Sequence, residues 1–160
     1  MGWFDPKPEA IRDVVLEALR SLPRPPPGEK VKELEYRDAV AQIFTAMGAT
    51  GVKREADVGR TGTNLDVYAN VNGHDFIVTI KRGCSEQKVK TVIGEISIVR
   101  QHWVPKNAGK RTFAIFLICG YAKDQELEAL GSFDPFRKAQ SNSDFEICEA
   151  CIPNGKWEKA

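Results

Sequence analysis

The residues most suited to chemistry gather around Asn72-Gly73, which stands between two β-prone runs. Asn-Gly in that setting is typical of a two-residue type I′ hairpin turn. In the resulting register Asp66 lies opposite Thr79, and Lys81 is one diagonal step away, at Cβ separations of about 5 to 8 Å. This combination of a carboxylate, a hydroxyl and an amine favours a functional site, although a hairpin with one solvated face gives the same pattern.

Side-chain alternation divides the predicted hairpin into a polar and an apolar face. The proposed site lies on the polar face. The apolar face, which we expect to be buried, comprises Leu65, Val67, Ala69, Val71, His74, Phe76, Val78 and Ile80.

These residues resemble the metal site of the PD-(D/E)XK nuclease superfamily, which has the restriction-endonuclease-like fold. In that family an Asp on one strand and an acid-X-Lys on the next form the site, and Asp66 and Thr79-Ile80-Lys81 occupy these places here. Thr79 departs from the pattern because it supplies no second negative charge. Some type II restriction enzymes of the family instead carry a glutamate on the following helix. Thirteen residues separate Lys81 from Glu95, which matches that arrangement.

The resemblance implies a nuclease that hydrolyses phosphodiester bonds in DNA with Mg²⁺, or with Mn²⁺ in its place. It implies that Asp66, Glu95 and the main-chain carbonyl of Ile80 hold the cation. Lys81 is then expected to orient or deprotonate the attacking water and to stabilise the transition state. Thr79 is expected to donate or accept a hydrogen bond rather than to bind the metal.

A second resemblance concerns the run from Tyr36 to Gly48, which is similar to the opening helix of Mrr-type restriction endonucleases. That helix usually carries a glutamate directly after its first aromatic residue. Arg37 stands at this place, with Glu35 nearby.

Basic residues follow the hairpin. Between Lys81 and Arg111 eight lysines and arginines face two acidic residues, whereas the whole chain carries a net charge of +1. Such segregation is typical of a surface that binds phosphates, although a solvated charged face also produces it. The residues expected to contact DNA are Arg82, Gln87, Lys88 and, in the glycine-containing loop at 59–64, Arg60.

The order of expected elements predicts an α/β fold with a mixed central sheet flanked by helices, which is a restriction-endonuclease-like core from about residue 34 to residue 119. The expected helices are 8–22, 31–47, 86–103 and one starting at 124–130. The expected strands are 52–56, the two arms of the hairpin, 112–119 and 145–152.

Residues 1–33 are expected to form an N-terminal helix and a proline-rich arm, followed by a nuclease-like domain at 34–160. The helix carries one apolar stripe, composed of Ile11, Val14, Val15, Leu19 and Leu22. That stripe packs either on its own domain or on a second protomer, so a homodimer through this arm is one of two alternatives.

The composition, with 42% hydrophobic and 28% charged residues, is ordinary for a globular protein. There is no apolar run long enough for a membrane span and no secretory signal, so we expect a cytoplasmic protein without a membrane partner. The alternative to a nuclease is a catalytically degenerate module of the same fold that binds DNA or mediates protein assembly.

Overall fold

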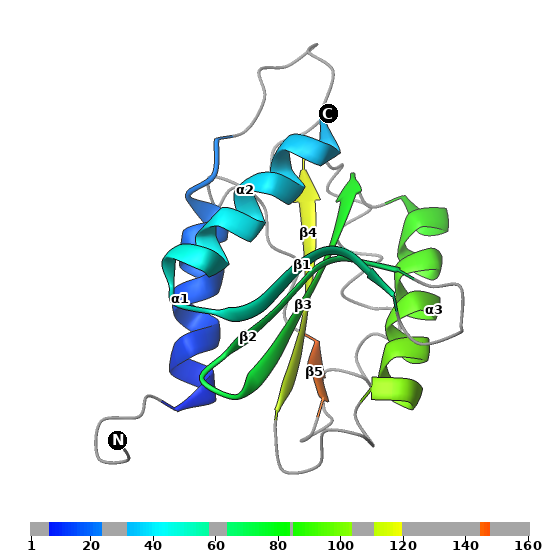
Figure 1. The fold of residues 1–160 in the computed structure, drawn as a ribbon. Helices are drawn as coiled ribbons and strands as arrows, with labels where there is room; N and C mark the ends of the chain where they lie inside the picture. The colour runs from blue at the N-terminus through cyan, green and yellow to red at the C-terminus, as the bar shows by residue number, and fades with distance from the viewer. Residues whose placement is uncertain are drawn as a thin grey trace.

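The described part of the chain forms a five-stranded sheet with helices on both sides (Figure 1). The computed structural model describes residues 7–23, 32–57, 64–83, 85–103, 111–119 and 145–147. Its elements are α1 (Pro8–Arg20), α2 (Glu33–Ala46), β1 (Thr50–Asp57), β2 (Asn64–Val71), β3 (His74–Arg82), α3 (Glu86–Trp103), β4 (Thr112–Cys119) and β5 (Phe145–Ile147). The helix expected to start at 124–130 lies outside these residues, and β1 is longer than the expected strand at 52–56.

The sheet is mixed, with the strand order β1-β2-β3-β4-β5. Pairing is antiparallel from β1 to β3 and parallel from β3 to β5. A parallel neighbour requires a crossover connection, and α3 lies in the connection between β3 and β4. The expected α/β class, with a mixed sheet flanked by helices, is therefore confirmed.

The hairpin between β2 and β3 has the predicted register, from Val71 paired with His74 to Val67 paired with Val78. Both turn residues have a positive φ, 54° at Asn72 and 86° at Gly73, which is the type I′ conformation. The side chain of Asn70 supports the turn by accepting a hydrogen bond from the Gly73 amide at 3.0 Å.

This turn gives a direct test of the hairpin. Gly73→Ala is expected to lower the free energy of unfolding by about 1 to 2 kcal/mol, because alanine adopts a left-handed conformation only at a cost. Urea denaturation measures the change. The matched control is Gly94→Ala in α3, where an added Cβ meets nothing within 4 Å and where alanine should stabilise the helix by up to about 1 kcal/mol. Equal stability of Gly73→Ala and wild type would contradict the type I′ turn.

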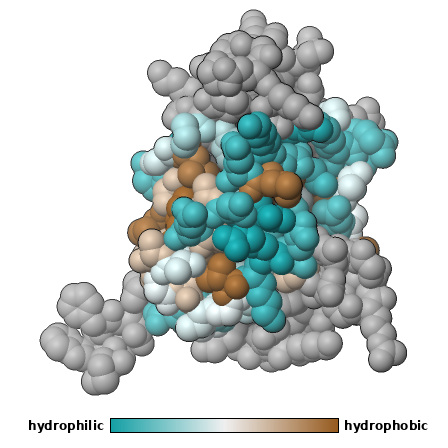
Figure 2. Space-filling model, turned by 45° about the horizontal axis from the view of Figure 1, so that its top comes forward, coloured by the Kyte–Doolittle hydropathy of each residue, from teal (hydrophilic) through white to brown (hydrophobic). Residues whose placement is uncertain are grey.

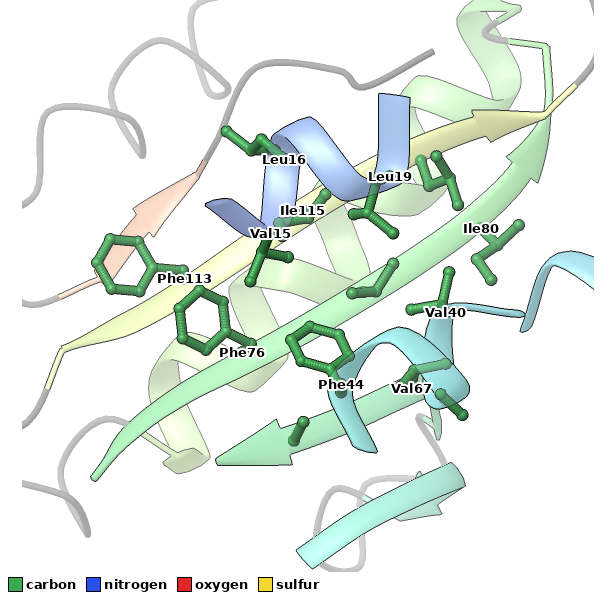
Figure 3. Packing of buried hydrophobic residues seen from close by; sticks show 14 of the residues in the cluster. Val15, Leu16, Leu19, Val40, Phe44, Val67, Phe76, Ile80, Phe113 and Ile115 are labelled. Carbon is green, nitrogen blue, oxygen red and sulfur yellow. The ribbon is translucent and has the colours of Figure 1, made fainter. Parts of the chain in front are cut away.

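The hydrophobic core lies between the apolar face of the hairpin and the helices α1 and α2 (Figure 3). Phe76 is its centre, with ring centroids 5.8 Å from Phe44 of α2 and 5.1 Å from Phe113 of β4. Figure 1 shows α1 and α2 on one side of the sheet and α3 on the other. The core contains the buried residues of α1, which are Ile11, Val15, Leu16 and Leu19.

The apolar stripe of α1 therefore packs mainly against its own chain, and Val14 is the member that stays exposed, at 57%. A homodimer through the N-terminal segment would need a surface other than this buried face. The homodimer and the boundary near residue 33 both remain predictions. No helix in the described ranges is long and apolar enough to cross a lipid bilayer.

The polar face of the hairpin is also covered over part of its length. On β3, Asp75, Ile77 and Thr79 are all buried. Asp75 Oδ1 accepts hydrogen bonds from the Tyr68 hydroxyl at 2.6 Å and from the Asn70 amide at 3.0 Å. A buried carboxylate needs such partners, and this network at the turn end of the hairpin leaves the other end for the candidate site.

Candidate active site

Asp66 lies where β2 and β3 separate. The pairing between these strands ends at Val67 and Val78, one position before Asp66. A continued ladder would pair the Ile80 amide with Leu65, but this amide donates to Asp66 Oδ2 at 2.7 Å. Figure 1 shows the start of β2 diverging from the end of β3. At this fork the Ile80 amide orients the Asp66 carboxylate.

The carbonyl of Ile80 shares the orientation of its amide. In an antiparallel ladder the amide and the carbonyl of one residue point toward the same neighbouring strand, here β2. The Ile80 amide donates to Asp66, so the carbonyl of the same residue points to the same side of β3 as this carboxylate. A metal contact by this carbonyl stays a prediction.

Lys81 and Glu95 meet next to this fork. Lys81 Nζ lies 3.8 Å from Glu95 Oε1, and the two side chains are 27% and 29% exposed. Burial raises the pKa of Glu95, Lys81 opposes that shift, and the negative charge of Asp66 adds to it. The expected trio of Asp66, Lys81 and Glu95 therefore comes together from β2, β3 and α3.

The pKa of Asp66 is raised too, first by burial, whereas the Ile80 amide and Lys81 act in the opposite direction. Two carboxylates with raised pKa values next to each other are a typical environment for a divalent cation, whose charge would offset both effects. Among the described residues no three His, Cys, Asp or Glu side chains converge to hold a metal. Mg²⁺ keeps several waters and is commonly bound through only one or two carboxylates.

Thr79 is buried, at 7% exposure, and follows Val78, the last residue of β3 paired with β2. It brings no charge to the site. Glu95, on the helix that follows the strand, lies near Lys81, and its role as the second metal ligand stays a prediction.

The predicted phosphate contacts cluster at the junction of β3 and α3. Arg82 and Gln87 are exposed there, and the Lys88 ammonium group donates to the carbonyl of Arg82. Ser85 caps α3 because its hydroxyl accepts from the Lys88 amide at 3.4 Å. Arg60 lies outside the described residues. Figure 2, which brings the top of Figure 1 forward, shows a mainly hydrophilic surface on the described part of this side.

One residue near the site that the sequence did not single out is Glu33, in the first turn of α2. Its Oε1 accepts a hydrogen bond from the Arg82 amide at 3.0 Å and lies 3.7 Å from Arg82 Nε. After burial, the charges of Glu33 and of a further residue, Glu55, are the other influences that raise the pKa of Asp66. Only the packing of α2 against the end of β3 reveals this neighbour.

Glu55, on the edge strand β1, lies opposite Asp66 in the β1–β2 register, between the pairs formed by Arg54 and Ala56. It has a left-handed backbone with φ of 53°, and its Oε1 lies 2.9 Å from Arg37 Nη1 on α2. Arg37 stands where an Mrr-type helix usually has a glutamate, and here it pairs with a glutamate from a neighbouring strand. No local pattern in the sequence shows this pairing.

Comparisons with known proteins support the fold. No model of a known protein family matches the chain, and no curated protein matches its sequence. The structure is similar to the small subunit of the heterodimeric restriction endonuclease R.BspD6I, with a TM-score of 0.51 and 12% identity over 88% of this chain and 72% of that chain. A weaker similarity, with a TM-score of 0.37 and 17% identity over 72% of this chain and 54% of the other, is to SfsA of Pyrococcus furiosus in complex with Ca²⁺. The first similarity agrees with a restriction-endonuclease-like fold.

Proposed function

We propose that this protein is a metal-dependent nuclease that cleaves phosphodiester bonds within DNA. The observation that carries the proposal is the meeting of Asp66, Lys81 and Glu95 at the fork of β2 and β3, with the Lys81–Glu95 contact at 3.8 Å. Two carboxylates of raised pKa that flank an amine are suited to hydrolysis, because perturbed pKa values cluster at functional sites. The restriction-endonuclease-like fold agrees with this chemistry but does not by itself establish it.

Asp66, Glu95 and the carbonyl of Ile80 are the residues that would hold Mg²⁺, or Mn²⁺ in its place. Such a cation, when bound, polarises the phosphate and makes water more acidic. The hydrogen bond from the Ile80 amide fixes the orientation of Asp66. Lys81 is placed to orient the attacking water and to stabilise charge on the phosphate oxygens.

Substrate binding would rest on the basic residues next to this centre. Arg82 follows Lys81 directly, and Gln87 and Lys88 lie in the first turn of α3, so we propose that these three residues flank the scissile phosphate. Arg60 in the loop at 59–64 is proposed as a further phosphate contact. Contacts of this kind set affinity and register on the duplex without selecting a sequence.

The test is cleavage of supercoiled plasmid DNA and of a single-stranded substrate, each with Mg²⁺, with Mn²⁺ and with EDTA. We expect the purified protein to nick or linearise the plasmid with either metal and to be inactive with EDTA. Asp66→Asn protein purified in parallel controls for contaminating nucleases. Absence of cleavage by wild type on both substrates would contradict the proposal.

Glu95 supplies a separate test of the second ligand. Glu95→Gln removes the charge with little change in shape, and we expect cleavage at limiting Mg²⁺ to fall by more than about a hundredfold, with partial recovery at high Mg²⁺. The measurement is the cleavage rate as a function of Mg²⁺ concentration. Glu17→Gln, the same change on the exposed surface of α1, should leave that curve unchanged. A normal curve for Glu95→Gln would assign the second ligand elsewhere.

The alternative is a degenerate module of the same fold that binds DNA or assembles with another protein. The DNA-binding module is favoured by Thr79, which is buried and uncharged where the family usually has its second acid. Assembly with another protein is favoured by the R.BspD6I chain of similar fold, which is one subunit of a heterodimer. This alternative predicts DNA binding that does not need metal, weakens steeply with salt and is not followed by cleavage.

A further inference from the structure

The last four residues of β3, Thr79 to Arg82, lie beyond its described pairing with β2. That pairing ends at Val78, whereas the pairing with β4 continues to Arg82 and Cys119. Lys81 is in this segment. The position of its amine therefore depends on whatever else holds the main chain there.

Side chains from three different elements hold this main chain. Glu33 of α2 accepts a hydrogen bond from the Arg82 amide at 3.0 Å. Cys119 of β4 has its sulfur 3.5 Å from the Lys81 carbonyl, to which it donates. Lys88 of α3 donates to the carbonyl of Arg82. Three successive polar groups of the main chain around the peptide bond after Lys81 are thus fixed by side chains.

Glu33 is the side chain that accepts from the Arg82 amide, and a carboxylate acceptor strengthens a hydrogen bond of this kind. Its second contact, with the Arg82 guanidinium at 3.7 Å, joins two side chains that are 42% and 53% exposed. Ion pairs this exposed contribute little. The hydrogen bond to the main chain is therefore the interaction that matters for position.

We infer that Glu33 is a positioning residue that holds the main chain after Lys81 and so places the Lys81 amine beside Glu95. This inference rests on the proposed function. Glu33 acts here as a hydrogen-bond acceptor for a main-chain amide, and its negative charge is secondary. A displacement of about 1 Å of a catalytic group costs up to about a hundredfold in rate, which sets the size of the expected effect.

The comparison of Glu33→Gln with Glu33→Ala separates the acceptor from the charge. Glutamine keeps an oxygen for the Arg82 amide, so we expect kcat to stay within about fivefold of wild type. Alanine removes the acceptor, and we expect kcat to fall by about tenfold to a hundredfold with KM for DNA nearly unchanged, because Lys81 acts in the chemical step. Glu35→Ala on the same helix removes an exposed carboxylate that lies 3.6 Å from Lys32 Nζ, and this control should behave as wild type.

A second measurement does not depend on cleavage. In the metal-free protein, labelled at the lysine ε-carbon, the NMR signal of Lys81 is identified by its loss in Lys81→Arg. It should shift in Glu33→Ala and stay in place in Glu33→Gln. Loss of activity in Glu33→Gln as large as in Glu33→Ala, or an unshifted Lys81 signal in Glu33→Ala, would overturn the positioning role. A protein that cleaves no DNA would remove the proposed function, and the NMR comparison would still decide what Glu33 does.

Discussion

Replacement of Asp66 by asparagine is expected to lower metal-dependent cleavage of plasmid DNA by more than about a hundredfold and to change DNA affinity by no more than a few-fold. Loss of groups that merely support a metal ligand costs about tenfold to a hundredfold, so loss of a ligand itself should cost more. DNA affinity depends on phosphate contacts by basic residues, which this substitution leaves in place. Cleavage assays and salt-matched binding titrations measure the two quantities.

The same substitution should not destabilise the fold. The asparagine side chain keeps an oxygen that accepts from the Ile80 amide, as Asp66 does at 2.7 Å. Because burial raises the pKa of Asp66 in the folded state, the native protein binds its proton more tightly than the unfolded chain, and stability falls as pH rises above the ordinary carboxyl range. Asparagine does not ionise, so Asp66→Asn removes this decrease in stability with pH. The metal-free variant should therefore melt at the same or a higher temperature near neutral pH.

A matched exposed carboxylate completes the design. Asp13→Asn on α1 makes the same chemical change at a side chain that is 66% exposed, and it should alter neither cleavage nor melting temperature. Unchanged cleavage by Asp66→Asn would contradict the site. A large fall in melting temperature would instead show that this carboxylate stabilises the fold.

The part of the site that is local in sequence could be predicted. Asn72-Gly73 determines the turn, and the turn determines the register, which runs as predicted up to Val67 and Val78, the pair next to Asp66. Each step depends on backbone conformations that side-chain type controls within a few residues. The apolar run of β4 likewise predicts a strand covered on both faces.

The residues that elements outside the hairpin bring close to the site could not be predicted from the sequence. Glu55 comes opposite Asp66 only through the β1–β2 register, which shifts by one residue between Thr50 and Lys53. Gly51 lies in that irregular segment with a φ of 61°. A shift of one residue in the pairing moves every side chain of a strand to the opposite face of the sheet. The alternation of residues in β1 alone therefore does not show on which face Glu55 lies.

The contact of Glu33 with the main chain beside Lys81 could not be predicted for a different reason. Its contact with Arg82 spans 49 residues of sequence and depends on how α2 packs over the end of β3. Helical periodicity identifies which side of α2 is buried, through Val40 and Phe44, but not which strand end its first turn will reach. The resemblance to an Mrr-type helix directs attention to Arg37, one turn further along. The structure shows that a carboxylate of the first turn contacts the main chain beside Lys81.

Lys81→Met is expected to separate metal binding from catalysis. Methionine keeps most of the length of the side chain and removes its charge, so we expect the cleavage rate to fall by about a hundredfold or more, as for loss of a group that assists proton transfer or stabilises the transition state. The amine repels any cation bound between Asp66 and Glu95, whose pKa values it lowers. Its removal relieves this repulsion, so the affinity for Mn²⁺ should increase at a pH well above the pKa of both carboxylates, where protons do not compete with the metal.

A fall in the cleavage rate together with a rise in Mn²⁺ affinity distinguishes a catalytic lysine from a structural one. Mn²⁺ binding, followed by electron paramagnetic resonance of the free ion, should weaken in Asp66→Asn and strengthen in Lys81→Met, although both variants lose cleavage. Lys90→Met, an exposed change on α3, is the control and should alter neither quantity. If Lys81→Met weakened Mn²⁺ binding, the lysine would be needed to hold the strand end in place, and a role in the chemical step would have to be abandoned. A module that only binds DNA has no use for an amine that weakens metal binding at its own site. Tighter Mn²⁺ binding combined with lost cleavage in Lys81→Met would therefore not be explained by such a module.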